Sequence, residues 1–352
     1  MTRILTVHPQ APEPESIAYA AAAILRGRLV AFPTETVYGL GANALDAAAV
    51  ARIFIAKDRP PEDPLIVHLA SEDDLPRVVS VIPPVAHELA RAFWPGPLTL
   101  ILPKHPRVPD NVTAGLSTVA VRVPAHPVAF ALLQASGVPI AAPSANRFGH
   151  PSPTTAQHVM DDLGSRIDLI LDGGPTTIGV ESTVLDVTRT PPLILRPGGL
   201  PREALEALIG PVAVRVETAA TKGPQPSPGL LGRHYAPRAE LILYLGSPAA
   251  ALAEMARLAR LKQAEGQRVG VLLADEDRPY FSHLPVFPFY LGPSSDLAQI
   301  ARNLFIGLRA LDEQGVDLIL ARDFGERGLG LAIRDRLRRA ASRVLDVNMI
   351  PL

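Results

Sequence analysis

The hydrophobic and polar positions of the chain follow two different patterns. In the first half, short apolar runs alternate irregularly with amphipathic stretches, and the run Leu29–Phe32 ends at a proline, as buried strands often do. From Leu241 onward, strand-like and helix-like stretches alternate, beginning with a strand over 241–245 and a helix over 249–264. We therefore expect an α/β protein, with a mixed twisted sheet and packed helices followed by a smaller Rossmann-like parallel α/β domain.

The same patterns predict the individual elements. Asp46 is expected to cap a helix whose apolar positions Val50, Ile53 and Phe54 lie at helical spacing. Thr154 or Thr155 is expected to cap a helix that ends at Leu163. Further helices are expected over 16–28, 71–79, 83–93, 127–136, 203–209, 297–311 and 331–341, and further strands over 65–69, 98–102, 118–124, 138–142, 169–171, 184–187, 193–195, 212–216, 268–273 and 316–320.

The chain is too long for one ordinary core, because it has 352 residues. The stretch 218–238 lacks periodicity and contains four prolines, so it is expected to connect two domains, 1–217 and 239–352. Its motif Arg233-His234-Tyr235-Ala236-Pro237 leaves two interpretations open. The stretch is either a passive spacer or a lid that folds back over a site.

Composition excludes several classes of protein. There is no cysteine, which excludes disulfides, thiolate-bound metals and a cysteine nucleophile. No apolar run is long enough to span a membrane, and residues 1–10 lack the apolar core of a signal peptide, so we expect a cytoplasmic protein with no membrane partner. The net charge of −1 does not suit a protein whose main task is gripping nucleic acid.

The stretch from Phe32 to His68 has the composition of a polar small-molecule site. Hydroxyls, a carboxylate and glycines follow the first strand, and a later helix delivers Lys57 and Arg59 into a loop bounded by prolines. Two such cations can bind a polyphosphate, but taken alone they more often form a solvated surface pair. His68, within an apolar strand, is either a core residue or a ligand contact.

Two more strands carry polar residues. Arg122 lies inside the apolar strand 118–124, with Thr118 on its side, and needs an anion, a partner carboxylate or solvent. Both a bound carboxylate and a structural ion pair satisfy that need. Ser144 and Asn146 alternate where the strand 138–142 ends, so both can point at one ligand.

Five motifs in order resemble the YrdC-type family of L-threonylcarbamoyl-AMP synthases, in its long, two-domain form. They are Lys57-x-Arg59 after a Thr-Glu-Thr-x-Tyr-Gly-Leu loop, Pro143-Ser144-Ala145-Asn146, Glu181-Ser182-Thr183-Val184, Leu195-Arg196-Pro197-Gly198 and the Arg233–Pro237 motif. The resemblance covers essentially the whole chain. It implies a YrdC-like catalytic domain, an enzyme of the nucleotidyltransferase class and a role in tRNA processing.

The resemblance implies that the chain forms threonylcarbamoyl-AMP and pyrophosphate from L-threonine, bicarbonate and ATP, with Mg²⁺ accompanying ATP. The product would pass to the machinery that transfers threonylcarbamoyl to tRNA adenosine, with at most transient tRNA contact. The family pattern implies catalytic roles for Lys57, Arg59, Ser144 and Asn146, threonine contacts for Thr36, His68, Arg122, Ala142 and Ser182, and ATP contacts for Arg59, Asp63, Thr118, Ser144, Ser152, Arg196 and Tyr235. No metal ligand from the protein is expected.

The chain departs from the family pattern at two positions. Asp63 stands where the family usually has asparagine, and a carboxylate cannot donate a hydrogen bond as an amide does and repels phosphate. Ser117 stands where relatives often carry an acid. The role of Asp63 toward ATP is therefore open unless it meets the ribose or the metal.

Three other functions compete with this interpretation. An RNA-binding module without nucleotide turnover would show salt-sensitive tRNA affinity. A carbamoyl-transfer enzyme of the hydrogenase-maturation kind would carry cysteine zinc motifs, which are absent. A third alternative is that the second domain senses another ligand. Gly325, Gly328 and Gly330 resemble a dinucleotide fingerprint, but their spacing is poor and favours a tight turn.

Overall fold

The computed structural model describes residues 2–215, 223–230 and 234–349. The chain divides into two compact units: Met1–Phe148, Ser152–Thr177 and Glu181–Leu231 form the first, and Gly149–Pro151, Ile178–Val180 and Gly232–Leu352 form the second. Two short loops of the first half thus belong to the second unit. Among the described residues, no helix has the length and apolar character needed to cross a bilayer.

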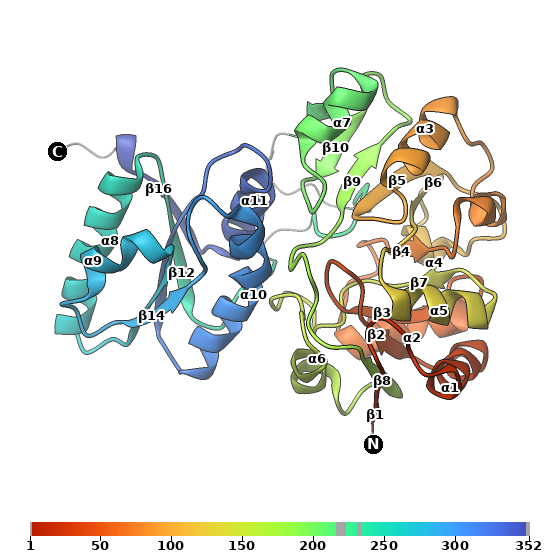
Figure 1. Ribbon diagram of the computed structural model, residues 1–352, viewed down its shortest axis with the longest axis horizontal. Helices are drawn as coiled ribbons and strands as arrows, with labels where there is room; N and C mark the ends of the chain where they lie inside the picture. Colours follow the sequence, from red (N-terminus) through yellow and green to blue (C-terminus); the bar gives the residue numbers. More distant parts are fainter. Residues whose placement is uncertain (1, 216–222, 231–233, 350–352) are drawn as a thin grey trace. The chain divides into compact units, whose positions relative to one another are not determined.

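One mixed sheet forms the centre of the first unit. Within the described residues its order is β1-β8-β2-β3-β7-β4-β6-β5-β9-β10-β11, and parallel and antiparallel neighbours both occur. Figure 1 shows these strands with the unit's helices around them. The strands are β1 (Arg3–Thr6), β2 (Val30–Phe32), β3 (Gly39–Asn43), β4 (Ile66–His68), β5 (Leu98–Pro103), β6 (Thr118–Arg122), β7 (Ile140–Ala141), β8 (Leu169–Asp172), β9 (Thr183–Asp186), β10 (Leu193–Arg196) and β11 (Ala213–Val214).

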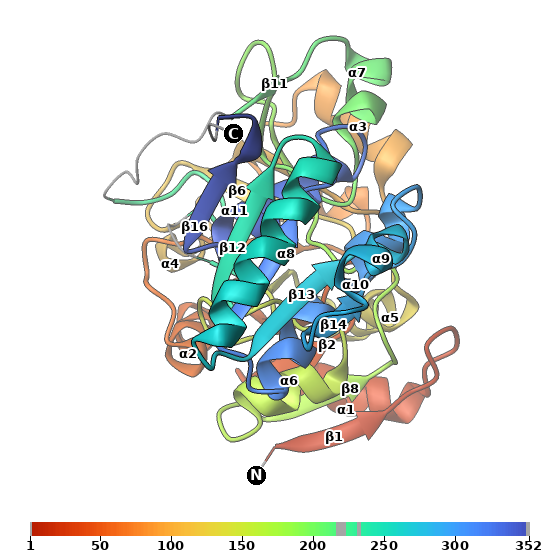
Figure 2. The ribbon, with the colours of Figure 1, turned by 90° about the vertical axis from the view of Figure 1, so that its left-hand side faces the viewer.

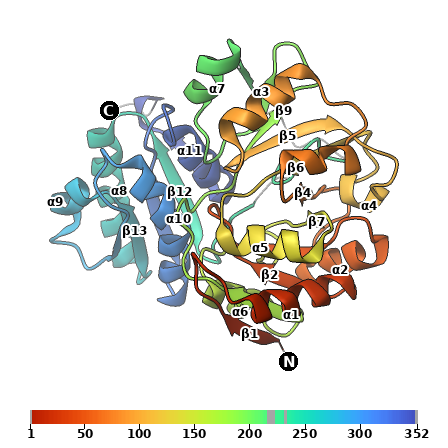
Figure 3. The same cartoon turned by 45° about the vertical axis from the view of Figure 1, so that its right-hand side comes forward.

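Two helices of the first unit begin at the caps that the sequence predicts. Asp46 accepts hydrogen bonds from the backbone of Ala48 and Ala49, and Thr155 accepts one from His158, so both predicted caps are confirmed. The helices α1 and α5 lie side by side (Figure 3). The helices are α1 (Pro14–Leu25), α2 (Ala47–Lys57), the 3₁₀ turn η1 (Glu72–Arg77), α3 (Pro84–Phe93), α4 (Asp110–Thr113), α5 (Pro127–Ser136), α6 (Ala156–Leu163) and α7 (Arg202–Ile209).

The two faces of the central strands differ in what they bury. One face carries Val67, Leu100, Val121 and Leu185, which belong to the main hydrophobic core. The opposite face carries only a small apolar cluster, formed by Ile66, Ile101, Ala120, Val184, Leu195 and Leu230. We call this side of β4, β5, β6 and β9 the site face, because residues two positions away from its apolar members point the same way.

Some predicted elements of the first unit were wrong in kind or length. The expected helix over 71–79 is a 3₁₀ turn, since Pro76 interrupts regular helical hydrogen bonding. The expected strand over 138–142 is reduced to the two residues of β7. Strand β3 was not predicted, because its glycines hide the strand pattern. A side chain at Gly41 would place its Cβ 2.8 Å from both Ile140 and Phe32, which explains the glycine there.

The second unit is a parallel α/β domain. Its sheet has the order β14-β13-β15-β12-β16, and every neighbouring pair is parallel within the described residues. Helix α8 lies across β12 and β13 (Figure 2). The elements are β12 (Glu240–Leu245), α8 (Pro248–Ala264), β13 (Val269–Leu273), η2 (Asp275–Asp277), α9 (Arg278–Phe281), β14 (Phe287–Tyr290), α10 (Leu297–Glu313), β15 (Leu318–Arg322), α11 (Gly330–Ala340), β16 (Arg343–Asp346) and η3 (Val347–Met349). The predicted fold class, a mixed sheet followed by a parallel α/β domain, is confirmed.

Candidate active site

Polar side chains collect on the site face where its strands end. His68 and Arg122 are direct register partners at the ends of the parallel strands β4 and β6. On the neighbouring strands, the Thr99 hydroxyl lies 2.7 Å from the Ser182 hydroxyl. All four are buried, and each lies two residues from an apolar member of the site face. The sheet therefore places a row of polar groups next to the apolar cluster of the site face.

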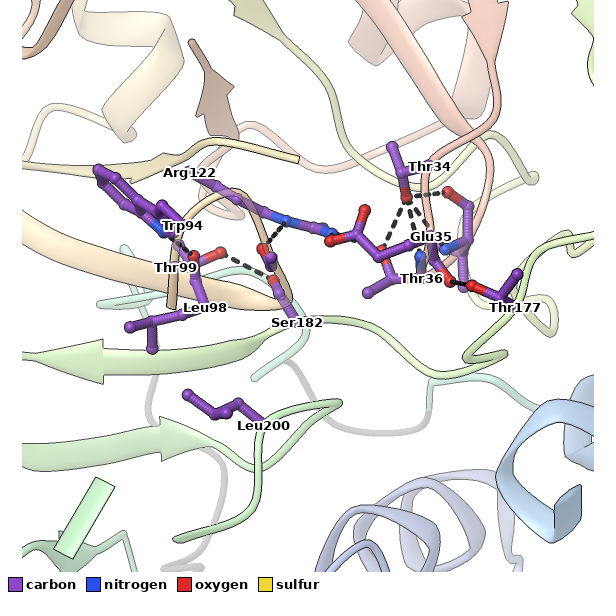
Figure 4. A network of polar contacts seen from close by, with 12 residues as sticks. Thr34, Glu35, Thr36, Trp94, Leu98, Thr99, Arg122, Thr177, Ser182 and Leu200 are labelled. Carbon is purple, nitrogen blue, oxygen red and sulfur yellow. Dashed lines mark hydrogen bonds and ion pairs between the residues drawn. The ribbon is translucent and has the colours of Figure 1, made fainter. Parts of the chain in front are cut away.

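Arg122 is the only described arginine of this row, and its contacts come from two loops. Its Nε donates to the carbonyl of Gly96 at 3.1 Å, and its Nη1 donates to the Thr36 hydroxyl at 2.9 Å. Its Nη2 lies 2.6 Å from Oε1 of Glu35. Figure 4 shows the side chains of Glu35 and Arg122 directed toward each other. Of the two explanations left open for this buried arginine, the structure contains the ion pair.

His68 is a buried neutral residue. Burial, reinforced by the nearby positive charge of Arg122, lowers the pKa of His68 to about 3. Its ring makes an edge contact with Phe32, with the ring centroids 6.1 Å apart. Its Nδ1 is buried without a hydrogen-bond partner among the described residues. A neutral imidazole with one uncommitted nitrogen can accept or donate one hydrogen bond to a ligand.

Ser182 connects this row to Arg196 at the end of β10. The Arg196 Nη2 donates to the Ser182 carbonyl at 2.9 Å and lies 3.2 Å from the Ser182 hydroxyl. The turn that follows needs a glycine, because a Cβ at Gly198 would lie 2.3 Å from the Ser182 carbonyl carbon. The glycine of the Leu-Arg-Pro-Gly motif thus allows β10 to approach the segment that holds Ser182.

Lys57 is buried against the backbone of the Ser144–Asn146 loop. Its Nζ donates to the carbonyl of Ser144 at 2.6 Å and also to the carbonyl of Asn146. Only 1% of its surface is exposed, and desolvation followed by the positive charge of Arg59 holds its pKa well below the usual range. The interpretation of a solvated surface pair is therefore wrong for Lys57. In this arrangement the lysine positions the loop.

Arg59 and Asp63 form an ion pair that is almost fully buried. Their Nη2 and Oδ2 atoms are 2.9 Å apart, and Arg59 also donates to the carbonyls of Asp63 and Pro64. Burial raises the pKa of Asp63, although the positive charge of Arg59 offsets part of that effect. Asp63 also accepts a hydrogen bond from the backbone of Gly229 at 3.3 Å. The surface-pair interpretation is wrong for Arg59 as well.

The connecting stretch has two described parts, of which 223–230 packs onto the first unit and 234–238 belongs to the second. Gln225 donates from its backbone to the carbonyl of Glu62 at 3.0 Å, and Arg196 Nη1 lies 3.5 Å from the carbonyl of Pro228. Leu230 joins the apolar cluster of the site face. Residues 223–230 are therefore not a solvated spacer. The expected lid also included 218–222 and 231–233, and residues 216–222 and 231–233 lie outside the described residues.

The remaining predicted residues lie as follows. Ala142 donates from its backbone to the carbonyl of Ile66 at 2.9 Å, and the buried Ser152 hydroxyl donates to a carboxylate oxygen of Glu181. Thr118 is partly buried at the opposite end of β6 from Arg122. Tyr235 is the predicted site residue that belongs to the second unit, where its ring lies 5.5 Å from the ring of Phe305.

Three polar residues of this region were missed by sequence reasoning. They are Glu35, Thr99 and Glu181, which contact Arg122, Ser182 and Ser152 respectively. Glu35 and Glu181 stand inside two of the motifs that carry the resemblance, so their position was a usable signal. Thr99 lies in an apolar strand and offered no signal beyond being a polar residue in such a strand.

Comparisons with known proteins find matches for both halves of the chain. A family model described as "Telomere recombination" matches residues 22–198, and one described as "Threonylcarbamoyl-AMP synthase, C-terminal domain" matches residues 200–342. A threonylcarbamoyl-AMP synthase from Pyrococcus abyssi is 49% identical, with 99% of this chain and 100% of the relative covered. One from Bacillus subtilis is 48% identical, with 92% of each chain covered.

Solved structures agree with these matches. The crystal structure of the Sua5 protein of Pyrococcus abyssi complexed with L-threonine is similar with a TM-score of 0.92 and 48% identity, over 98% of this chain and 99% of that one. The Escherichia coli YciO structure is similar with a TM-score of 0.51 and 28% identity, over 56% of this chain and 96% of that one. From family models and relatives that span both of its units, the chain belongs to the threonylcarbamoyl-AMP synthase family.

Proposed function

We propose that this protein forms threonylcarbamoyl-AMP and pyrophosphate from L-threonine, bicarbonate and ATP. The observation that carries the proposal is the site face, where predicted substrate contacts from separate strands meet in a buried polar row. A relative with nearly half of its residues identical over the full length bears the name of this activity. The same reaction explains why the site combines groups for an amino acid with cations for phosphates.

The threonine end of the site is proposed to lie at Arg122. Its guanidinium suits a carboxylate, and the uncommitted Nδ1 of His68 can meet a ligand hydroxyl or carboxylate oxygen. Thr36, Ser182 and the backbone at Ala142 border the same row and are proposed to complete the contacts. A closely similar structure was solved with L-threonine, which supports an amino-acid pocket in this fold.

The nucleotide end is proposed to use the residues beneath the segment 223–230. Arg59 and Arg196 supply guanidinium forks for phosphate oxygens, while Ser144 and Ser152 supply hydroxyls. Lys57 acts on this end by fixing the loop that carries Ser144 and Asn146. Thr118, Asp63 and Tyr235 remain proposed ATP contacts on the family pattern, and Asp63 is paired with Arg59 in this structure.

The chemistry requires positioning more than a strong base. The neutral amine of threonine and bicarbonate give a carbamate and water. An anionic oxygen of the carbamate then attacks the α-phosphorus, and the bond between the α-phosphorus and pyrophosphate breaks. Negative charge then builds on phosphoryl oxygens, and we propose that Arg59, Arg196 and the Ser144–Asn146 loop stabilise it. One such donor typically contributes about 3 kcal/mol to lowering the barrier.

Mg²⁺ is proposed to enter with ATP. Within residues 2–215, 223–230 and 234–349, no group of three or more His, Asp or Glu side chains is arranged to hold a metal ion. A Mg²⁺ ion bound mainly by phosphate oxygens and water needs no such group, so the residues present fit a metal carried by the nucleotide. When bound, the ion would neutralise part of the triphosphate charge.

The roles of the two domains follow from this assignment. We propose 1–217 as the catalytic domain, 218–238 as a linker whose described segment 223–230 covers the site, and 239–352 as the second domain. The product is proposed to serve threonylcarbamoylation of tRNA through a separate transferase, with the cytoplasm as the compartment. Near-neutral charge supports at most transient contact with tRNA itself.

The test is pyrophosphate release from ATP and Mg²⁺, with each substrate left out in turn. We expect release that requires both L-threonine and bicarbonate, and a fall of at least tenfold in Arg196→Lys, which keeps the charge but loses the fork. Arg189→Lys is the matched control, because Arg189 is exposed and pairs with Asp186 at the opposite end of β9 from Ser182. Absence of release by folded parent protein, together with salt-sensitive tRNA binding, would replace the proposal by the RNA-binding alternative.

A further inference from the structure

Glu35 is a buried carboxylate for which neither the motifs nor the family pattern gave a role. It is only 6% exposed and stands between the two threonines of the loop that follows β2. Its Oε1 lies 2.6 Å from Arg122 Nη2, yet neither of its oxygens accepts a hydrogen bond of ordinary geometry from a described residue. A buried carboxylate normally accepts several hydrogen bonds, so Glu35 has acceptor capacity left for a ligand.

The loop around Glu35 is held in place by its neighbours. The Thr34 hydroxyl donates to the carbonyl of Val37 at 2.7 Å and accepts from the backbone of Thr36 and Val37. The Thr177 hydroxyl donates to the Glu35 carbonyl at 3.3 Å. Figure 4 shows these contacts on the backbone side, with the Glu35 carboxylate turned to Arg122. The Glu35 carboxylate is therefore held facing Arg122 and cannot easily rotate toward water.

The Glu35–Arg122 pair has no net charge, and its carboxylate and guanidinium groups lie next to each other. An α-amino acid at neutral pH is likewise neutral overall, with an ammonium and a carboxylate on one carbon. His68 beside the pair is uncharged, so no extra cation favours a plain carboxylate ligand. A lone arginine would bind any carboxylate, whereas a neutral pair of charges favours a zwitterion over a simple anion.

We infer that Glu35 binds the α-ammonium group of the amino-acid substrate while Arg122 binds its carboxylate, so that Glu35 determines specificity for amino acids. The inference rests on the proposed function, because it takes the Arg122 end of the site as the threonine pocket. The ammonium supplies the donors that the Glu35 oxygens lack within the described residues. The carboxylate also holds the nitrogen that must become the carbamate nitrogen.

A purely structural role for Glu35 makes a different prediction. If the carboxylate only neutralised Arg122, its loss would change the binding of every carboxylate ligand in the same way. Ammonium recognition instead predicts a loss confined to ligands with an α-amino group. The comparison of L-threonine with the 2,3-dihydroxybutyrate of the same configuration, in which a hydroxyl replaces the amino group, separates the two roles.

The experiment is calorimetric titration of the full-length protein with these two ligands. We expect the parent to prefer L-threonine by at least 100-fold. Glu35→Gln should lower L-threonine affinity at least 30-fold, whereas dihydroxybutyrate affinity should stay the same or rise, because Arg122 loses the carboxylate that neutralises it. Glu35→Asp keeps the charge but shortens the side chain by one methylene. It should therefore lower L-threonine affinity by less than Glu35→Gln does and leave dihydroxybutyrate affinity unchanged. Asp186→Asn is the matched control, since it removes a buried carboxylate paired with Arg189, and it should alter neither affinity.

The outcomes distinguish the inference from the function on which it rests. Unchanged L-threonine affinity in folded Glu35→Gln, or equal losses for both ligands, would overturn the inference and leave the proposed function intact. If Glu35→Gln fails to fold, Glu35→Asp decides by the same comparison. A folded parent that binds no L-threonine and releases no pyrophosphate would overturn the proposed function, and the inference with it.

Discussion

The departure at Asp63 leads to a quantitative prediction for Asp63→Asn. The carboxylate is fully buried, pairs with Arg59 at 2.9 Å and accepts from Gly229 at 3.3 Å. Asparagine has nearly the same shape and can still accept the Gly229 hydrogen bond. Arg59 keeps its two carbonyl partners at Asp63 and Pro64 in either protein. The substitution therefore removes the negative partner of Arg59 while leaving the other contacts of both side chains in place.

The direction of the stability change follows from the pKa of Asp63. Burial raises that pKa more than Arg59 lowers it, so the folded chain binds this proton more readily than the unfolded chain does. The carboxyl then contributes stability fully below the unfolded pKa of about 3.9, and this contribution is lost as the pH rises through the raised folded value. At pH 7 we expect Asp63→Asn to have an unfolding free energy equal to or greater than that of the parent. Near pH 3.5 the difference should vanish.

The effect on ATP affinity follows from electrostatics. Asp63 neutralises Arg59, a proposed phosphate contact, and adds a negative charge beside the triphosphate. A unit charge about 6 Å from a phosphate charge, at an effective dielectric constant of about 20, contributes about 3 kcal/mol of repulsion. Because Mg²⁺ and solvent reduce this value, we take half of it. Asp63→Asn should therefore bind ATP about tenfold more tightly, which corresponds to about 1.4 kcal/mol.

Two assays test this reasoning on the same preparation. Urea unfolding at pH 7 and pH 3.5 gives the stability difference, and calorimetric titration with ATP and Mg²⁺ gives the affinity. Asp58→Asn is the matched control, because Asp58 pairs with Arg147 and Arg166 on the surface and should change ATP affinity less than twofold. A loss of more than about 1 kcal/mol at pH 7, or weaker ATP binding, would show that the attraction to Arg59 outweighs the desolvation of Asp63.

Three further substitutions probe other contacts. Lys57→Met removes the donor that holds the Ser144–Asn146 loop, and pyrophosphate release should fall about 100-fold. Folding lowers the pKa of Lys57, so the contribution of Lys57 to stability falls as the pH falls from about 10. The difference in unfolding free energy between parent and Lys57→Met, measured by urea unfolding, should therefore be less favourable to the parent at pH 7 than at pH 10. Gly198→Ala places a Cβ within 2.4 Å of the backbone of 181–183 and should lower the unfolding free energy by about 3 kcal/mol in urea unfolding, more than at a surface glycine. Leu230→Ala should loosen 223–230, seen as faster proteolysis in that segment and about a tenfold higher KM for ATP, while L-threonine affinity stays unchanged.

Elements with strong periodicity were predictable from the sequence, and so was the existence of two domains with different sheets. The caps at Asp46 and Thr155 were predictable because a side-chain oxygen at a helix start has a local role. Strands β1, β3, β14 and β16 were missed. A short edge strand, or one with glycine in its interior, has no alternating pattern, and pairing with distant partners decides its conformation.

The positions of the site residues were predictable from motifs, but their partners were not. Arg122 was known to need an anion, yet Glu35 lies 87 positions earlier in the chain and only the sheet brings the two together. Likewise Lys57 and Arg59 suggested two equivalent cations, but nothing in the sequence showed that both side chains bind backbone carbonyls of the protein. Such long-range pairs depend on topology, which the local sequence does not encode. The segment 223–230 was unpredictable for a related reason, since one leucine and a few backbone hydrogen bonds hold it.

The two ends of the site use nearly separate sets of contacts. Glu35 and Arg122 contact each other through side chains on the amino-acid end, whereas Asp63 and the segment 223–230 belong to the nucleotide end. Arg196 joins them, because its guanidinium holds Ser182 at 2.9 Å and also approaches the carbonyl of Pro228. Interactions without shared partners usually contribute independently, whereas groups in one hydrogen-bond network do not. A substitution at Glu35 should therefore change threonine affinity without changing the phosphate contacts. Any coupling between the binding of the two substrates must pass through groups such as Arg196 and Ser182.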